Sequence, residues 1–587
     1  MHQQRDLTWK ACAPAIAALA VAACSGGGGG SSDPASTGGG GGSPPASSSP
    51  PPPPPPPAVT GLDSQVEVAR FVTQAGFGAT SQELLALVGA DAADWTEAQI
   101  NTAPTLYLPG LLQQENSGED IGNRAHSPLF WNAMMSGDDQ LRQRMVFALS
   151  QIIVVSDDSM AGESLEMAYY VDILSRNAFG NYRDILQEVT YSPAMADYLT
   201  YLRNRKADDR TGRMPDENYA RELLQLFTIG LVELNMDGTP RLNGSGDPIE
   251  TYTNDDVEGL ARVFTGLGYK GTSFSNRDRD DDYASSPLQM YADQHSEKEK
   301  AFLGTVIPAG TPGDETIDRA LDAIFEHPNM APFLSRQLIQ RFTASNPSPA
   351  YVQRVATAFE AGSFVSPDGS RFGTGQRGDL EATIAAILLD DVVHSETSLE
   401  DPGAGKIREP ILKYVHWARA FNVSNADAGE QGRFNDTRRT SDRLGQHPFR
   451  SPSVFNFYRP GFIAPGTESG SAGLTAPELQ LINSGTTFGY SNWMTDFAFE
   501  RVRRSGVQQF VPDYSAELAL AETPEALVDH LDLLLTAGTL EDEARTDIVN
   551  ALNALVITDS NAESDRQRRV RAAVLMVADS AAFAVVR

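Results

Sequence analysis

The chain has 587 residues, with 77 acidic against 46 basic side chains and a formal net charge of −31. This acidic balance argues against nucleic acid as a partner, because phosphate binding depends on clustered Lys and Arg. Hydrophobic residues make up 41% of the chain, enough to build large cores. The only cysteines, Cys12 and Cys24, lie near the start. The remaining sequence therefore has no disulfide, cysteine nucleophile or cysteine-ligated zinc.

The first 24 residues have the pattern of an export signal. A positively charged start precedes an apolar stretch, residues 11–20, that is too short to span a bilayer. It ends in Val-Ala-Ala-Cys at residues 21–24, which resembles the lipobox of bacterial lipoproteins. The resemblance implies that residues 1–23 are removed and that Cys24 carries lipid. Ser25 follows it in place of the Asp that retains lipoproteins in the inner membrane, which favours the outer membrane. An ordinary signal peptide is the alternative, and both interpretations predict export.

Residues 24–58 are predicted to form a tether. They are rich in Gly, Ser and Pro and contain no large apolar side chain, so they cannot form a core. The proline run at 50–57 predicts a polyproline II rod about 25 Å long, at ~3.1 Å per residue. We expect the tether to hold the body, residues 59–587, away from the membrane, with a further boundary expected near 235–252. The alternative is that the proline run is a ligand for an aromatic groove.

From Gly61 onward apolar residues recur at helical spacing, and strand-like alternation is scarce. The predicted fold class is therefore mainly α, a large multi-helix domain with long irregular loops and few or no strands. Helical patterns cover residues 138–155, 162–178, 216–230, 253–264, 379–389, 407–421, 524–535, 541–556 and 566–586. Long irregular inserts, candidates for surface-site loops, are predicted at residues 235–251, 270–294, 422–449 and 459–474.

Two of these helices begin at recognisable caps. Thr253 is a predicted N-cap, with Asp256 three residues later as a variant of the capping box. Asp379 is the predicted N-cap of the following apolar run, which gives the Arg-Gly-Asp tripeptide at 377–379 a structural role rather than an adhesive one. The 253–264 helix should bury one face, consisting of Val257, Leu260, Ala261 and Phe264.

The segment 216–230 separates a polar and an apolar face. Glu217 and Arg221 have the favoured orientation for an ion pair one turn apart. A structural role for the polar face is favoured, and a functional role stays open. The predicted core stripe is Tyr219, Leu223, Leu226 and Phe227, and the polar face holds Glu217, Asn218, Arg221, Glu222 and Gln225.

Several sequence blocks in order, including this segment, carry a resemblance to a known family. The further blocks are residues 69–80, 140–144, 255–266, 295–304, 327–329, 336–338, 377–380, 406–410 and 451–456. From about Gly61 to its end the chain resembles the bacterial domain of unknown function 1800 (DUF1800) family. The resemblance implies a large, helical, exported protein, and it supplies no catalytic residue. Members are often encoded beside proteins of the domain of unknown function 1501 family, which resemble alkaline-phosphatase-like hydrolases. This implies an exported protein partner, in addition to the membrane reached through the lipid.

Two functions remain open on sequence grounds. The first is a cell-envelope lipoprotein that acts as a helical scaffold or accessory protein for an exported partner, consistent with the lack of nucleophile-elbow, zinc-protease and P-loop motifs. The alternative is a hydrolase of envelope or extracellular polymer. It would use the carboxylates Glu222 and Asp256 with His295, Arg221 and Arg262 around a cleft, because two carboxylates in different environments can divide acid and base roles.

An acidic loop offers weak candidates for a metal site. Asp278, Asp280, Asp281 and Asp282 lie close together and precede His295. Clustered carboxylates suit a divalent cation such as calcium, and a nearby imidazole suits other divalent metals. A solvated acidic loop is the alternative, since arginines interleave with the aspartates. No organic cofactor is predicted.

Overall fold

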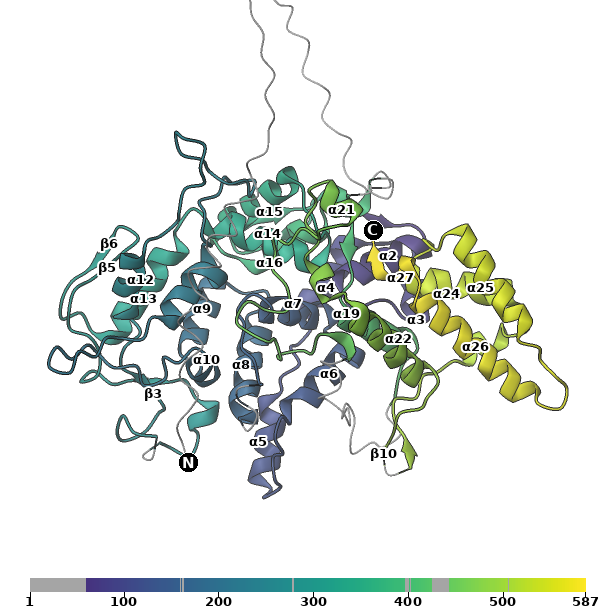
Figure 1. Ribbon diagram of the computed structural model, residues 1–587, viewed down its shortest axis with the longest axis horizontal. Helices are drawn as coiled ribbons and strands as arrows, with labels where there is room; N and C mark the ends of the chain where they lie inside the picture. The colour runs from purple at the N-terminus through teal and green to yellow at the C-terminus, as the bar shows by residue number, and fades with distance from the viewer. Residues whose placement is uncertain are drawn as a thin grey trace, which may run out of the picture. The chain divides into compact units, whose positions relative to one another are not determined.

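The computed structural model describes residues 60–158, 160, 163–276, 279–395, 401, 403–424, 443–504 and 506–587. The predicted signal peptide, the tether and Cys24 lie outside the described residues. Within them the fold is mainly α-helical, as the sequence predicts (Figure 1). Among the described residues, no helix combines the length and the apolar character needed to cross a bilayer.

The α-helices follow one another with short strands between them. They are α2 (Gln65–Ala75), α3 (Ser81–Ala86), α4 (Ala92–Asn101), α5 (Leu108–Asn116), α6 (His126–Ser136), α7 (Gln140–Ser150), α8 (Ser164–Arg176), α9 (Tyr182–Thr190), α10 (Pro193–Tyr198), α11 (Asn218–Glu222), α12 (Asn254–Ala261), α13 (Gly313–Phe325), α14 (Met330–Phe342), α15 (Pro349–Ala361), α16 (Leu380–Leu388), α17 (Asp391–His394), α19 (Pro410–Ala420), α21 (Glu468–Ser471), α22 (Ser484–Ala498), α23 (Ser515–Ala519), α24 (Pro524–Leu531), α25 (Asp542–Ala554), α26 (Ala562–Ala578) and α27 (Ala581–Ala584). Single-turn 3₁₀ and π segments are η1 (Leu223–Thr228), η2 (Tyr283–Ser285), η4 (Pro477–Leu481) and η5 (Asp532–Thr536).

The strands of the described residues form antiparallel pairs of two or three residues each. The pairs are β1 (Gly61–Leu62) with β2 (Ala90–Asp91), β3 (Leu267–Gly268) with β4 (Gln289–Met290), β5 (Lys300–Phe302) with β6 (Thr305–Ile307), β7 (Phe364–Val365) with β8 (Arg371–Phe372), β9 (Lys406–Ile407) with β12 (Val585–Val586), and β10 (Arg503–Arg504) with β11 (Val507–Gln508). Because these pairs are so short, helix packing builds the core.

The predicted caps are confirmed. Asp256 and Thr253 exchange the reciprocal hydrogen bonds of a capping box at the start of α12. Asp379 accepts a hydrogen bond from the Ala382 N–H at the start of α16. The helix α12 packs closely against β5 at Gly259. The absence of a side chain there permits this approach, since a Cβ atom on Gly259 would lie 1.8 Å from the Ala301 carbonyl oxygen. The apolar face predicted for α12 is buried, as is the face of α7 made by Leu141, Met145, Leu149 and Ile152.

The predicted helix at 216–230 is not a regular α-helix. It runs as α11 for five residues and continues as the π-helix η1, where the Thr228 hydroxyl donates to the Leu223 carbonyl at 2.5 Å. The inward face differs from the predicted one. Within η1 Leu224 is fully buried and Leu226, predicted in the core stripe, is only half-buried, while Glu222 of α11, expected on the polar face, is only 7% exposed.

The helical pattern predicted at 566–586 is interrupted, which corrects the sequence analysis. The helix α26 ends at Ala578, Ser580 caps the short helix α27, and residues 585–586 form the strand β12. A continuous helix would prevent these residues from pairing with β9. Likewise, the pattern at 524–535 divides into α24 and the π-helix η5.

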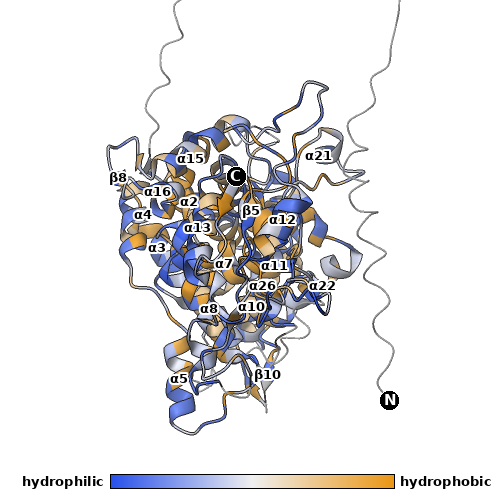
Figure 2. Ribbon diagram, turned by 90° about the vertical axis from the view of Figure 1, so that its left-hand side faces the viewer, coloured by the Kyte–Doolittle hydropathy of each residue, from blue (hydrophilic) through white to orange (hydrophobic). Residues whose placement is uncertain are grey.

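The core brings the two ends of the described body together. The strand β12 pairs with β9 and contacts α2, so elements near residues 70, 406 and 586 lie side by side (Figure 1). The helices α24, α25 and α26 pack on one another, and α14, α15 and α16 form another closely packed group. Figure 2 shows hydrophilic outer faces on α12 and α13 and apolar residues gathered between the helices. Trp131 and Trp417 are fully buried there.

Candidate functional site: a buried cationic centre

Arg221 and Glu222, two of the predicted catalytic residues, have different environments on α11. Arg221 Nη2 donates to Glu217 Oε2 at 3.1 Å, which confirms the predicted ion pair, and to Asn254 Oδ1 at 3.2 Å. Glu222 is buried, and its Oε2 atom has no hydrogen-bond partner. Burial raises the pKa of Glu222 to about 7, while neighbouring Arg221 lowers it. Glu222 is therefore a titratable group near neutral pH.

The other three predicted catalytic residues have separate local contacts. Asp256 is held by the α12 capping box and accepts from the Leu303 N–H at 2.7 Å. His295 is buried, with Nδ1 2.8 Å from the Thr265 carbonyl oxygen, and burial lowers its pKa, so the ring is neutral at pH 7. Arg262 is the half-buried C-cap of α12. No hydrogen bond or ion pair joins any two of the five residues, all of which lie in the described part of the chain.

The candidate metal loop contains a local ion pair. Lys270 Nζ lies 2.8 Å from Asp282 Oδ2 and 4.0 Å from Asp280 Oδ2, while Asp281 is exposed. Asp278 lies outside the described residues. Where the chain is described, no three His, Cys, Asp or Glu side chains are grouped to hold a metal ion. The divalent cation stays a prediction.

A cluster of buried charges lies elsewhere, and the sequence analysis proposed none of its members as a site residue. Each side chain is almost completely shielded from solvent. We name the cluster the cationic centre; it consists of Arg144, Arg341, Lys406, Arg408, Glu409 and Glu478.

Lys406 binds both carboxylates of the cationic centre. Its Nζ atom lies 2.5 Å from Glu478 Oε1 and 3.7 Å from Glu409 Oε1, and it donates to the Gln340 carbonyl oxygen at 2.9 Å. These contacts join β9, α14 and η4, three elements distant in sequence.

Further hydrogen bonds hold the two carboxylates as acceptors. Gln151 donates to Glu409 Oε2 at 2.9 Å, and Gln446 donates to the same oxygen. The Ser345 hydroxyl donates to Glu478 Oε2 at 2.8 Å. Burial raises the pKa of Glu409, but the surrounding cations outweigh burial and lower it below its ordinary value. Glu478 is therefore engaged by a cation and a hydroxyl, and Glu409 Oε2 by two amides, while Glu409 Oε1 faces Lys406 without a hydrogen bond.

Several guanidinium N–H groups of the centre have no hydrogen-bond acceptor. Arg144 Nη2 donates to the Arg341 carbonyl oxygen, and its guanidinium lies over the Phe342 ring. Its Nε and Nη1 atoms are buried without a hydrogen-bond partner, as are the same atoms of Arg341, which stacks on the Tyr458 ring at 4.8 Å. Buried polar groups are normally satisfied, so these donors need an explanation.

Arg408 completes the centre from the side of β9. Its Nη2 atom lies 2.6 Å from His416 Nδ1, its Nη1 atom donates to the Phe583 carbonyl oxygen at 3.3 Å, and its guanidinium covers the Phe583 ring. Burial lowers the pKa of Arg408 to about 9, so the group remains charged at pH 7.

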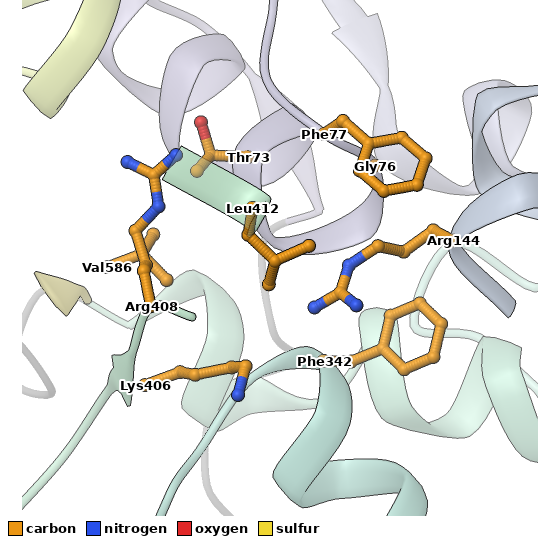
Figure 3. A pocket seen from close by; sticks show the side chains of 9 residues that line it. All are labelled: Thr73, Gly76, Phe77, Arg144, Phe342, Lys406, Arg408, Leu412 and Val586. Carbon is orange, nitrogen blue, oxygen red and sulfur yellow. The ribbon is translucent and has the colours of Figure 1, made fainter. Parts of the chain in front are cut away.

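Two adjoining hollows reach the centre. The inner cavity has a volume of about 10 Å³, and Arg144, Lys406 and Arg408 line it (Figure 3). An outer cleft of about 200 Å³ lies between α2, η5 and β12. Both are bordered by Thr73, Arg408 and Val586, so Arg408 forms part of the wall between them.

The segment 449–458 links the centre to a second buried ion pair. Asp157 Oδ1 accepts from Arg450 Nε at 2.9 Å, and Tyr458 donates to Gln151 Oε1 at 2.8 Å. In the same segment Phe449 and Asn456 have φ angles of 56° and 61°. The left-handed region is unfavourable for an aromatic residue, and such strain persists where surrounding contacts enforce it.

The centre therefore offers buried positive charge in excess of its two carboxylates, Glu409 and Glu478. This arrangement suits the binding of negative charge, and it contains no activated nucleophile. The sequence signal was partial: Arg144 lies in the block 140–144, and Lys406, Arg408 and Glu409 lie in the block 406–410, both of which carry the family resemblance. Sequence order alone does not show that these blocks meet.

The profile of the family described as "Protein of unknown function (DUF1800)" matches residues 70–585. The chain therefore belongs to this family, which confirms the resemblance inferred from the sequence blocks. No curated protein matches the chain, and no solved structure matches it.

Proposed function

We propose that this member of the DUF1800 family is an exported, lipid-anchored envelope protein whose helical body acts as a scaffold or accessory protein for an exported partner. The observation that carries this proposal is that each of the five hydrolase candidates has its own local contacts, with no hydrogen bond or ion pair between any two of these described residues. Asp256 caps a helix, Arg221 pairs with Glu217, and His295 binds a backbone carbonyl. These contacts account for the residues through structural roles, which supports the scaffold over the hydrolase.

The anchor is tested by mass spectrometry of the mature N-terminus and by membrane fractionation. We expect Cys24 to be the lipid-modified first residue, and Cys24→Ser to release the protein from the membrane. The matched control is Cys12→Ser, because Cys12 lies in the segment predicted to be removed. An unmodified N-terminus at another residue would contradict the anchor.

The scaffold is tested by affinity capture of the full chain from solubilised envelopes. We expect one exported protein at a stoichiometric ratio, and the family resemblance favours an alkaline-phosphatase-like hydrolase. The control bait carries only residues 1–58 on an unrelated protein, which identifies binding to the tether. Recovery of the full chain without any stoichiometric partner would contradict the proposal.

One observation favours the alternative hydrolase. Glu222 is a buried carboxyl group with a pKa near 7, within the range that suits a general acid or base. It also precedes a π-helix, a feature found frequently at functional sites. If Glu222→Gln abolishes cleavage of envelope polymer while Glu217→Gln does not and both variants stay folded, the hydrolase replaces the scaffold.

A further inference from the structure

The charges of the cationic centre do not balance. Four cations, Arg144, Arg341, Lys406 and Arg408, face two carboxylates within it. Arginine retains its proton here, since burial lowers the pKa of Arg144 only to about 10 and that of Arg408 to about 9. Burial of charge is unfavourable unless opposite charge accompanies it, so the centre requires further negative charge.

The groups around the centre do not supply that charge. His416, beside Arg408, is neutral because burial lowers its pKa well below the ordinary value, and burial raises the pKa of Tyr458 so that its hydroxyl keeps its proton. Lys413, on the next helix, lies over the Tyr490 ring, and the nearby carboxylate of Asp579 offsets its charge. The imbalance therefore remains after the neighbouring groups are included.

The inner cavity lies where the unpaired donors are found. Figure 3 shows the Arg144 guanidinium extending toward the space, with the Lys406 side chain along one side and Arg408 on the other. Arg144 is buried, and its Nε and Nη1 atoms have no partner. No carboxylate lines this cavity, whose other walls are Thr73, Gly76, Phe77, Phe342, Leu412 and Val586.

The size of the cavity restricts its occupant. A volume of about 10 Å³ holds roughly one water molecule, so a monatomic ion fits with slight expansion whereas a phosphate or sulfate does not. The outer cleft, which shares Thr73, Arg408 and Val586 with the cavity, provides a route from solvent.

We propose that the inner cavity of the cationic centre binds a single halide ion, chloride under ordinary ionic conditions, between Arg144, Lys406 and Arg408. The ion supplies charge that the described side chains lack and accepts hydrogen bonds from unpaired guanidinium donors. This structural anion site goes beyond the proposed scaffold function and does not depend on it.

The first test measures thermal unfolding of the full chain in detergent at pH 7.5. Sodium chloride is exchanged for sodium gluconate at constant ionic strength, because gluconate is too large for the cavity. Above the dissociation constant, each tenfold rise in chloride should raise Tm by about 1 °C, and bromide should act similarly. An equal Tm in chloride and gluconate would overturn the proposal. Stabilisation by sulfate but not by halides would move the site to the outer cleft and also overturn it.

Matched variants locate the effect. Arg144→Met should remove the halide dependence of Tm. Arg142→Met, also buried and on α7, should keep it, because Arg142 donates to the carbonyls of Ser175, Ile100 and Thr102 instead of facing the cavity. A halide response retained in Arg144→Met would overturn the proposed location.

A third measurement does not require a variant to fold. Crystals of the full chain soaked in sodium bromide should give an anomalous-scattering peak between Arg144, Lys406 and Arg408. A map in which water occupies this position, with bromide only at the surface, would overturn the proposal.

Discussion

Arg221 and Arg354 are both partly exposed arginines, but the carboxylates they bind differ in burial. The side chains of Arg221 and Glu217 are 40% and 38% exposed, whereas Arg354 binds Asp390, whose side chain is only 4% exposed. An exposed ion pair contributes little because water solvates both partners after separation. We predict that Arg221→Ala lowers the free energy of unfolding by less than about 1 kcal/mol. Arg354→Ala should lower it by roughly 2–3 kcal/mol, because it leaves a buried carboxylate unpaired.

Urea denaturation of the full chain in detergent measures both values. Equal losses for the two variants would contradict the argument from carboxylate burial. A large decrease in the free energy of unfolding for Arg221→Ala alone would mean that the polar face of α11 is shielded from solvent.

Glu222 predicts a pH dependence of stability. Burial raises its pKa from the ordinary 4.5 to about 7 in the folded protein. Between these values the folded state retains a proton that the unfolded chain has lost, so the contribution of Glu222 to stability falls as pH rises from 4.5 to 7. Glu222→Gln imitates the protonated form. We expect it to match the wild type near pH 4.5 and to be more stable by about 2–3 kcal/mol at pH 8.

Unfolding free energies from pH 4.5 to 8 measure the difference between variant and wild type. Glu217→Gln is the control, because its partly exposed carboxylate should give a flatter difference. A Glu222→Gln difference that does not change with pH would show that Glu222 titrates at its ordinary value.

At the scale of elements, Asn329 connects α14 to the segment that follows the π-helix η1. Its Nδ2 atom donates to the carbonyls of Ile229 and Val232, and its Oδ1 atom accepts from the Leu234 N–H at 2.8 Å. Asn329→Ala leaves these backbone groups unpaired. We predict a loss of roughly 2–4 kcal/mol, with faster amide hydrogen exchange at Leu234.

Hydrogen exchange with mass spectrometry measures the local effect of Asn329→Ala. Asn243→Ala is the control, since Asn243 makes only turn contacts with Ser245 and Asp247 at the exposed end of the insert. That variant should lose less than about 1 kcal/mol. Unchanged protection at Leu234 in Asn329→Ala would contradict the proposed connection.

Capping residues and apolar spacing predicted the positions of several helices. The prediction failed where the helical geometry is not that of a regular α-helix. The capping box of α12 and the apolar spacing of α7 and α12 each involve residues only a few positions apart in the sequence. The π-helix η1 was missed because a period of 3.6 residues assumes one hydrogen-bond pattern throughout, whereas the Ile229 N–H bonds five residues back to the Leu224 carbonyl oxygen at 3.0 Å. The sequence analysis also placed Glu222, the last residue of α11, on the polar face because of its charge, although its side chain is buried.

At the scale of the whole molecule, Lys406 holds distant parts of the chain together. It is 1% exposed and contacts Glu409, Glu478 and the carbonyl of Gln340. Lys406→Met removes the cation and leaves two buried carboxylates with less compensation. We predict a loss of about 3–5 kcal/mol in global stability, measured by urea denaturation.

Lys298→Met is the control for Lys406→Met. Lys298 is 58% exposed and pairs with Asp209, which is 86% exposed, so its loss should cost less than about 1 kcal/mol. Comparable stability of the two variants would show that the cationic centre is hydrated rather than buried.

The cationic centre was not predictable from one sequence, although four of its six residues, Arg144, Lys406, Arg408 and Glu409, stood in recognised blocks. Arg144, Arg341, Lys406 and Glu478 belong to four separate elements, and their meeting depends on how helices pack. By contrast, the Glu217–Arg221 pair was predictable because both partners occupy one helical turn. Spacing along the chain thus favoured the surface of α11 as a candidate site. The cluster of buried charges could be identified only from the packing of the elements in the structure.

The pairing of β12 with β9, and its contact with α2, has a consequence for how the protein is made. The helix α2 leaves the ribosome long before Val585 and Val586 are added, and Val586 borders the inner cavity. The walls around Arg408 therefore stay incomplete until residues 585–586 have been made. Nascent chains shortened before Val585 should expose this charged interior, and chaperones and proteases would act on them before the full-length chain closes it.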